Sequence, residues 1–146
     1  MVGILVATHG GFADGILNAV ELLTGKPEKV ETIGLYHGDG IDEFSTKVED
    51  AIARLDDGDG VLVFVDIIGG SPYNAVMKCI AKQEKLKAIA GMNMAMLIQA
   101  VMMREGNHLK ELCDLCEEAG TSALEVMNRA YMKMISEADN HEEDEF

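Results

Sequence analysis

Three groups of residues in this chain have the types and the spacing that phosphoryl chemistry requires. His9 follows a short apolar run, Asp66 follows another, and residues 69–72 are Gly-Gly-Ser-Pro at the start of a helical pattern. An imidazole is a nucleophile near neutral pH, and a carboxylate can orient it. A glycine-rich turn before a helix exposes main-chain N–H groups to an anion. The set therefore predicts a histidine that carries a phosphoryl group as a phosphoramidate.

The residues around this histidine support the same interpretation. Glycines at positions 10–11 and 69–70 let the main chain of two helices approach an anion closely. We expect Ser71 to be the N-cap of the second of these helices, with Pro72 at its first helical position. The catalytic candidates are thus His9, Asp66 and Ser71, and the phosphate-binding candidates are Gly10, Gly11, Gly69, Gly70 and Ser71.

Short apolar runs alternate with segments of helical spacing up to residue 91. The apolar runs predict strands at residues 2–7, 30–36, 61–65 and 86–91. Helical spacing and stop signals predict helices at residues 12–24, 41–55 and 71–82. This order is typical of an α/β fold with an open, four-stranded parallel sheet and helices on both faces. Such a fold places His9 and Asp66 at the carboxyl ends of two strands, where open α/β sheets bind their ligands.

The pattern changes after Gly91. Residues 92–103 are apolar almost all round, and residues 108–119 have the spacing of a helix. Residues 121–135 fit either a helix or a short edge strand. The acidic residues 136–146 predict a disordered tail, so that one domain is expected to span residues 1–135.

The composition limits the classes of partner. The chain has 146 residues, of which 48% are hydrophobic, and a formal net charge of −14. The apolar content suits one domain with a buried core, whereas the negative charge disfavours nucleic acid and anionic membrane surfaces. No apolar run is long enough to insert into a membrane, and the first strand lacks the flanks of a signal peptide. Three cysteines within helical patterns fit reduced thiols. We expect a cytoplasmic protein with no metal site and no cofactor.

Three segments carry a resemblance to a known family. They are residues 4–10 (ILVATHG), 65–75 (VDIIGGSPYNA) and 89–97 (IAGMNMAML). An early Thr-His-Gly combined with Asp-x-x-Gly-Gly-Ser-Pro resembles the mannose-family EIIA component of the bacterial phosphoenolpyruvate-dependent sugar phosphotransferase system. The resemblance covers roughly residues 1–130.

This resemblance implies a role for each site residue and a set of partners. It implies that His9 accepts a phosphoryl group from phospho-HPr and passes it to an EIIB protein, normally to a histidine. In that scheme Asp66 bonds to the imidazole, and Ser71 helps to hold the phosphoryl oxygens. The resemblance also implies a homodimer that exchanges an antiparallel C-terminal strand. Because the chain ends in an acidic tail, we expect EIIB to be a separate polypeptide that connects this protein to the membrane components EIIC and EIID.

Three other functions are compatible with parts of the pattern. Ser71, His9 and Asp66 have the residue types of a serine hydrolase triad, although Pro72 lacks the N–H that a nucleophile elbow supplies to an oxyanion. A receiver-like domain phosphorylated on Asp66 needs an acidic pair after the first strand, where this chain has Thr8 and His9. The third alternative is a non-catalytic regulatory module that has the same fold.

Overall fold

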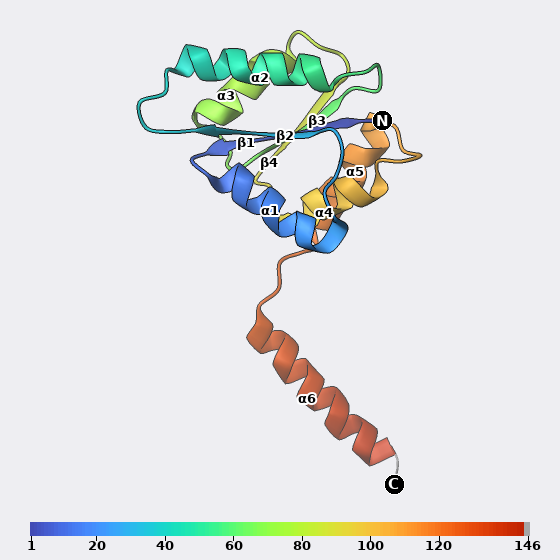
Figure 1. Cartoon of the computed structure of the whole chain (residues 1–146). Coiled ribbons are helices and arrows are strands. Elements are labelled where there is room, and N and C mark those ends of the chain that lie inside the picture. Colours follow the sequence, from blue (N-terminus) through green and yellow to red (C-terminus); the bar gives the residue numbers. More distant parts are fainter. Residues whose placement is uncertain (145–146) are drawn as a thin grey trace.

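Strands and helices alternate along the chain as far as the fourth helix, as the sequence predicts (Figure 1). The structure is a computed structural model that describes residues 1–144, with side chains described to residue 140. In chain order the elements are β1 (Gly3–His9), α1 (Phe12–Thr24), β2 (Val30–Leu35), α2 (Ile41–Leu55), β3 (Val61–Val65), α3 (Gly70–Ile80), β4 (Leu86–Ala90), α4 (Met94–Met103), α5 (Leu109–Thr121) and α6 (Met127–Asp144).

The four strands form one sheet in the order β2-β1-β3-β4, and every neighbouring pair is parallel. Ala7 of β1 lies opposite Val65 of β3, and His9 lies opposite Leu35 of β2. The carboxyl ends of β1 and β3 therefore meet at one edge of the sheet, which brings His9 and Asp66 together. The predicted open, parallel α/β sheet is confirmed.

Helices cover both faces of this sheet (Figure 1). One face packs against α1, α4 and α5, and the other packs against α2 and α3. Alternate side chains of β1 supply the two cores, with Ile4 and Val6 on the first face and Leu5 and Ala7 on the second. Each fully buried aliphatic side chain contributes about 1.5–3 kcal/mol. This two-sided burial is the physical reason why β1 is apolar from Ile4 to Ala7.

Two element boundaries differ from the prediction in ways that affect the site. β1 continues to His9, because the N–H of Gly10 still donates to the carbonyl of Leu35 at 2.7 Å. The prediction that Ser71 is an N-cap is wrong, since α3 begins at Gly70 and its N-cap is Gly69. Pro72 is instead the third residue of α3, where the helix needs no N–H from it.

The C-terminal segment differs most from the prediction. Residues 123–126 are neither helix nor strand, and α6 then extends away from the rest of the molecule (Figure 1). The helix continues through residues 136–144, where the sequence predicted a disordered tail. Residues such as Ala, Glu, Met and Lys favour a helix here, and Lys133 lies 4.0 Å from Glu137 one turn later. Glu145 and Phe146 lie outside the described residues.

None of the helices within residues 1–144 is long and apolar enough to cross a bilayer.

Candidate functional site

The imidazole of His9 is oriented by the carboxylate of Asp66. Nδ1 of His9 lies 2.9 Å from Oδ2 of Asp66, and the main-chain N–H of His9 donates to the same oxygen at 3.0 Å. An ionised carboxylate can only accept hydrogen bonds, so Nδ1 carries the ring hydrogen. Nε2 is left with a free lone pair, which makes it the nucleophilic atom of the ring.

Asp66 is held in its ionised form. Its Oδ1 accepts from the N–H of Ile67 at 3.0 Å, and its side chain is only 12% exposed. Partial burial raises the pKa of Asp66, but the main-chain and ring hydrogen bonds from His9 outweigh that effect and leave the pKa below its ordinary value. The His9 side chain is 46% exposed, so a partner protein can reach the ring while its carboxylate partner stays shielded.

The Gly69-Gly70 turn lies against the free side of the imidazole. Both glycines have positive φ, at 82° and 86°. A Cβ atom on Gly70 would lie 3.3 Å from Cε1 and 3.4 Å from Nε2 of His9, so any other residue there would crowd the nucleophile. The N-terminus of α3 has no side-chain cap, and helix starts with uncapped first-turn N–H groups can bind anions. The predicted pairing of His9 with a glycine-rich helix start is present.

The second predicted anion-binding segment, Gly10-Gly11, joins β1 to α1. Gly10 has a φ of 54°, and Gly11 is the N-cap of α1. A side-chain hydroxyl within β1 caps this helix, since the N–H of Ala13 donates to Oγ1 of Thr8 at 2.9 Å. Sequence reasoning missed Thr8, because a capping side chain is expected at the N-cap and Thr8 lies three residues before the Gly11 N-cap.

Ser71 is the residue directly after the Gly69-Gly70 turn. It is half-buried and lines a cavity of about 520 Å³ between α2 and α3, together with Ser45, Asn74 and Lys78 among others. Within residues 1–140, whose side chains the structure describes, its hydroxyl makes no hydrogen bond to His9. The structure thus brings the His9 ring into contact with Asp66 and places Gly70 beside it. It does not assemble a Ser-His-Asp triad.

Exposed apolar side chains follow the site residues along the chain. Phe12 is 48% exposed at the start of α1, and Ile67 and Ile68 are exposed directly after Asp66. Tyr36, also exposed, places its hydroxyl 3.7 Å from the position of a Cβ on Gly11. An apolar rim beside an accessible nucleophile suits contact with another protein.

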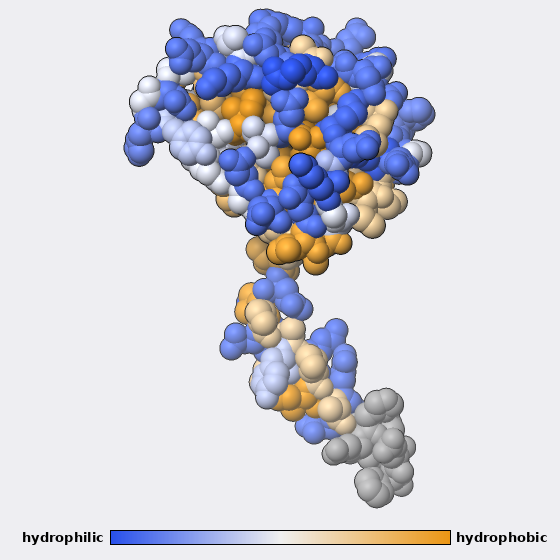
Figure 2. Space-filling view, viewed as in Figure 1, coloured by the Kyte–Doolittle hydropathy of each residue, from blue (hydrophilic) through white to orange (hydrophobic). Residues whose placement is uncertain are grey.

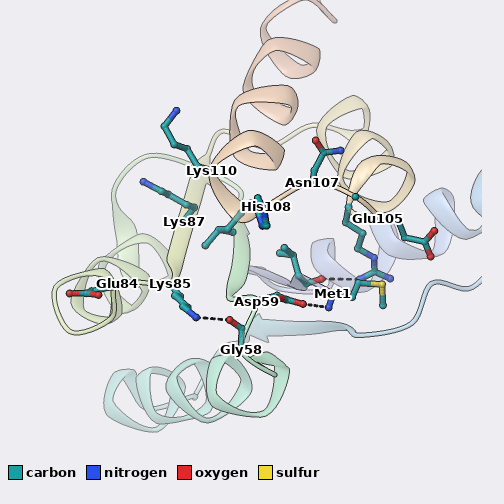
Figure 3. A pocket seen from close by; sticks show the side chains of 14 residues that line it. Met1, Gly58, Asp59, Glu84, Lys85, Lys87, Glu105, Asn107, His108 and Lys110 are labelled. Atoms are coloured by element: carbon teal, nitrogen blue, oxygen red, sulfur yellow. Dashed lines mark hydrogen bonds and ion pairs between the residues drawn. The ribbon is translucent and has the colours of Figure 1, made fainter.

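A larger cavity of about 840 Å³ lies at the amino ends of the strands, at the end of the sheet opposite to His9 (Figure 3). Its basic side chains are mostly engaged within the fold. Lys85 donates to the carbonyl of Gly58 at 2.7 Å, and the buried guanidinium of Arg104 donates to main-chain carbonyls, including that of Lys29 at 3.3 Å. The whole length of β1 separates this cavity from His9, so it plays no part in the chemistry at Nε2.

The Cys113-x-x-Cys116 pair has the spacing of a redox or metal site but not its environment. Both residues lie within α5, and burial raises the pKa of the Cys116 thiol to about 12. Such a thiol is neither a ready nucleophile nor a ready ligand. Among the residues that the structure describes, no group of three or more His, Cys, Asp or Glu is arranged to hold a metal ion.

Comparison with known protein families identifies one that matches most of this chain. The EIIA-man family, described as PTS system fructose IIA component, matches residues 3–117 of this chain. The chain belongs to this family of phosphotransferase system (PTS) EIIA components. The match spans both segments that hold the site, from β1 with His9 to α3 with Gly70.

Individual EIIA relatives agree with this membership. The mannose-specific EIIAB component of Escherichia coli K12 is 33% identical over 127 residues, which cover 86% of this chain and 39% of that protein. The chain thus spans about two fifths of the length of that relative. The fructose-specific EIIA component of Bacillus subtilis is 26% identical and aligns over 99% of both chains.

Solved EIIA structures share the fold. The EIIA component from Streptococcus agalactiae superposes with a TM-score of 0.82 at 26% identity and covers 88% of this chain and 99% of its own. The IIA protein associated with the fucose utilization operon of Streptococcus pneumoniae has a TM-score of 0.78 at 30% identity, and the match covers 89% of this chain and 99% of that one. The family match and the shared fold together make this chain an EIIA component of the mannose family.

Proposed function

We propose that this EIIA component carries a phosphoryl group on Nε2 of His9, which it accepts from phospho-HPr and passes to an EIIB protein. The observation that carries the proposal is the pair of contacts on the ring, with Asp66 at Nδ1 and Gly70 beside Nε2. The first contact sets the tautomer, and the second supports an anion site beside Nε2, because the start of α3 has no side-chain cap.

The proposed transfer balances as a displacement at phosphorus. The lone pair of Nε2 attacks phosphorus, the bond between phosphorus and its donor atom breaks, and the electron pair of that bond stays with HPr. The His9 ring becomes formally cationic while its hydrogen remains on Nδ1, and the Asp66 carboxylate at 2.9 Å balances that charge. Transfer to EIIB is the same displacement in reverse, with an atom of EIIB as the attacking group.

Positioning and electrostatics would supply the catalysis. The uncapped start of α3 offers main-chain N–H groups to the phosphoryl oxygens, and we propose that glycines 10–11 and 69–70 allow this close approach. Ser71, in the first turn of α3, is the nearest side-chain hydroxyl along the chain to this turn. We expect it to assist transfer without being required for it.

The partners follow from the same surface. We propose that HPr and EIIB dock in turn on the apolar rim that includes Phe12, Tyr36 and Ile68, because both must reach the same exposed ring. Contact with membrane components EIIC and EIID would then be made through EIIB.

We also propose that the chain forms a homodimer through its C-terminal segment. Apolar residues of this segment are exposed, including Met127, Tyr131 and Met132, and Figure 2 shows apolar surface along α6. β4 is an edge strand of the sheet, so its outer side is open to a strand from another chain. A second copy that contributed residues 122–126 as an antiparallel strand would pair with the outer side of β4, and the same contact would cover the exposed apolar residues of the C-terminal segment.

The experiment for the proposed function is phosphorylation with purified partners. The protein is incubated with phosphoenolpyruvate, Enzyme I and HPr, and intact mass is measured before and after acid treatment. We expect one acid-labile phosphate, lost in His9→Gln and retained in the control His37→Gln, which changes an exposed loop histidine. A phosphate that persists in His9→Gln would refute His9 as the carrier. Labelling of Ser71 by a serine-directed probe would instead support the hydrolase.

A further inference from the structure

Thr8 is a buried hydroxyl directly beside the nucleophile. Its side chain is fully buried, whereas the next residue, His9, is exposed. Thr8 follows Ile4 and Val6 on the face of β1 that packs against α1, and its Oγ1 accepts from the N–H of Ala13 in the first turn of α1 at 2.9 Å. The same hydroxyl donates to the carbonyl of His9 at 3.1 Å. One oxygen therefore links the strand end to the helix start.

The main chain of His9 is consequently held at both of its polar atoms. Its N–H donates to Asp66 at 3.0 Å, and its carbonyl accepts from Thr8 at 3.1 Å. Asp66 also holds the ring at Nδ1, so it fixes the direction in which Nε2 points. Thr8 acts on the other side of the same residue and fixes where the main chain lies relative to α1.

We propose that Thr8 is a positioning residue for phosphoryl transfer, because its hydroxyl fixes His9 and the start of α1 as one unit. This inference rests on the proposed function and adds a residue to it. The Gly11 N-cap of α1 supplies no side chain, so the cap comes from Thr8 in the strand. In-line attack on phosphorus needs the nucleophile and the surrounding N–H groups in fixed register, and a misplacement of ~1 Å can slow a reaction about 100-fold.

The test compares variants that keep or remove the hydroxyl. Thr8→Val has nearly the same shape without the oxygen, and Thr8→Ser keeps the oxygen without the methyl group. Thr24→Val is the matched control, because the Thr24 hydroxyl donates to the carbonyl of Val20 at the opposite end of the same helix, at 3.2 Å. The measurement is the single-turnover rate of transfer from phospho-HPr to His9 at several concentrations of phospho-HPr. The temperature is kept well below the midpoint of thermal unfolding of each variant.

We expect the maximal rate to fall about 10- to 100-fold in Thr8→Val, with the HPr concentration for half-maximal rate unchanged. Thr8→Ser should restore the rate to within about threefold, and Thr24→Val should transfer at the wild-type rate. A purely structural role would lower the unfolding midpoint in Thr8→Val but leave its transfer rate unchanged, and that result would overturn the proposal.

A second variant covers the case in which Thr8→Val does not fold. Thr8→Ala removes the same oxygen with less bulk, and its rate is then compared with that of Thr8→Ser. If neither Val nor Ala folds while Ser does, the hydroxyl is needed by the fold and the proposal fails. A wild-type protein that takes up no phosphate refutes the proposed function itself, whereas phosphorylated wild type with equal rates in the Thr8 variants refutes only this inference.

Discussion

Replacing Asp66 with asparagine removes one charge from the site while it keeps nearly the same shape. The carboxylate accepts three hydrogen bonds, two at Oδ2 from His9 and one at Oδ1 from the N–H of Ile67. An asparagine side chain offers one acceptor oxygen and one NH2 group. Either His9 or Ile67 must then face a donor with its own N–H group, and the ring loses its anionic neighbour.

The size of the effect follows from the charge that forms during transfer. When Nε2 bonds to phosphorus, the ring of His9 becomes cationic and its Nδ1–H bond to Asp66, 2.9 Å long, becomes charge-assisted. A hydrogen bond to a charged group contributes about 1.5–3 kcal/mol. The loss falls on the transition state more than on the resting site, so the rate of transfer in Asp66→Asn should fall about 10- to 150-fold.

The assay is single-turnover transfer from phospho-HPr, followed by intact mass. Asp39→Asn is the matched control, because Asp39 accepts a main-chain hydrogen bond from Tyr36 at 2.8 Å near the end of β2 and does not contact His9. We expect Asp39→Asn to transfer at the wild-type rate. Equal rates in wild type and Asp66→Asn would refute the orienting role of this carboxylate, as would an equal loss in both variants.

Three further changes test other parts of the argument. Because the pKa of Asp66 in the folded protein lies below 3.8, its ionised form stabilises the fold above that pH, and the contribution is lost as the pH falls through the lower folded value. The free energy of unfolding, measured by circular dichroism, should therefore fall less steeply with decreasing pH below pH 3.8 in Asp66→Asn than in wild type. Gly70→Ala should destabilise the fold by about 1–2 kcal/mol and slow transfer, because it adds a Cβ at positive φ beside Nε2. Its control, Gly106→Ala, has positive φ and no neighbour within 4 Å, so it should lose stability without losing transfer rate. Sedimentation should give the mass of two chains for the wild type and of one chain when residues 122–146 are deleted.

Each of these expectations has an opposite result. Acid unfolding of equal steepness would show that Asp66 is not ionised more readily in the folded state. Wild-type transfer by Gly70→Ala would separate the Gly69-Gly70 turn from the phosphoryl site. A one-chain mass for the wild type at micromolar concentration would contradict the homodimer.

The sequence predicted the sheet and the main contact of the site because both depend on strong, regular patterns. Apolar runs and helical spacing settle the order of strands and helices, and parallel strands necessarily bring their carboxyl ends to one edge. His9 and Asp66 follow two of those strands, so their contact required only that β1 and β3 be neighbours.

Finer features depended on interactions that a pattern does not contain. Gly70 adopts a positive φ and becomes the first residue of α3, which moves Ser71 into the helix and away from the N-cap position. Helix ends are decided by differences of a few tenths of a kcal/mol, and sequence patterns do not resolve them. The hydroxyl of Thr8 is recognisable only when β1 and α1 are seen together. In α6, weak helical propensity decides the conformation, because within the part of the chain that the structure describes no core packs against this segment.

The placement of His9 at the end of β1 has a consequence for how one protein serves two others. Ile4, Leu5, Val6 and Ala7 are fully buried between two paired strands, so their amide hydrogens should be among the slowest in the chain to exchange with deuterated water. The reactive nitrogen is therefore attached to the segment that opens least often. This nitrogen would have the same position in the complex with the phosphoryl donor and in the complex with the acceptor. Any conformational change that distinguishes the two complexes would then occur in the partner proteins.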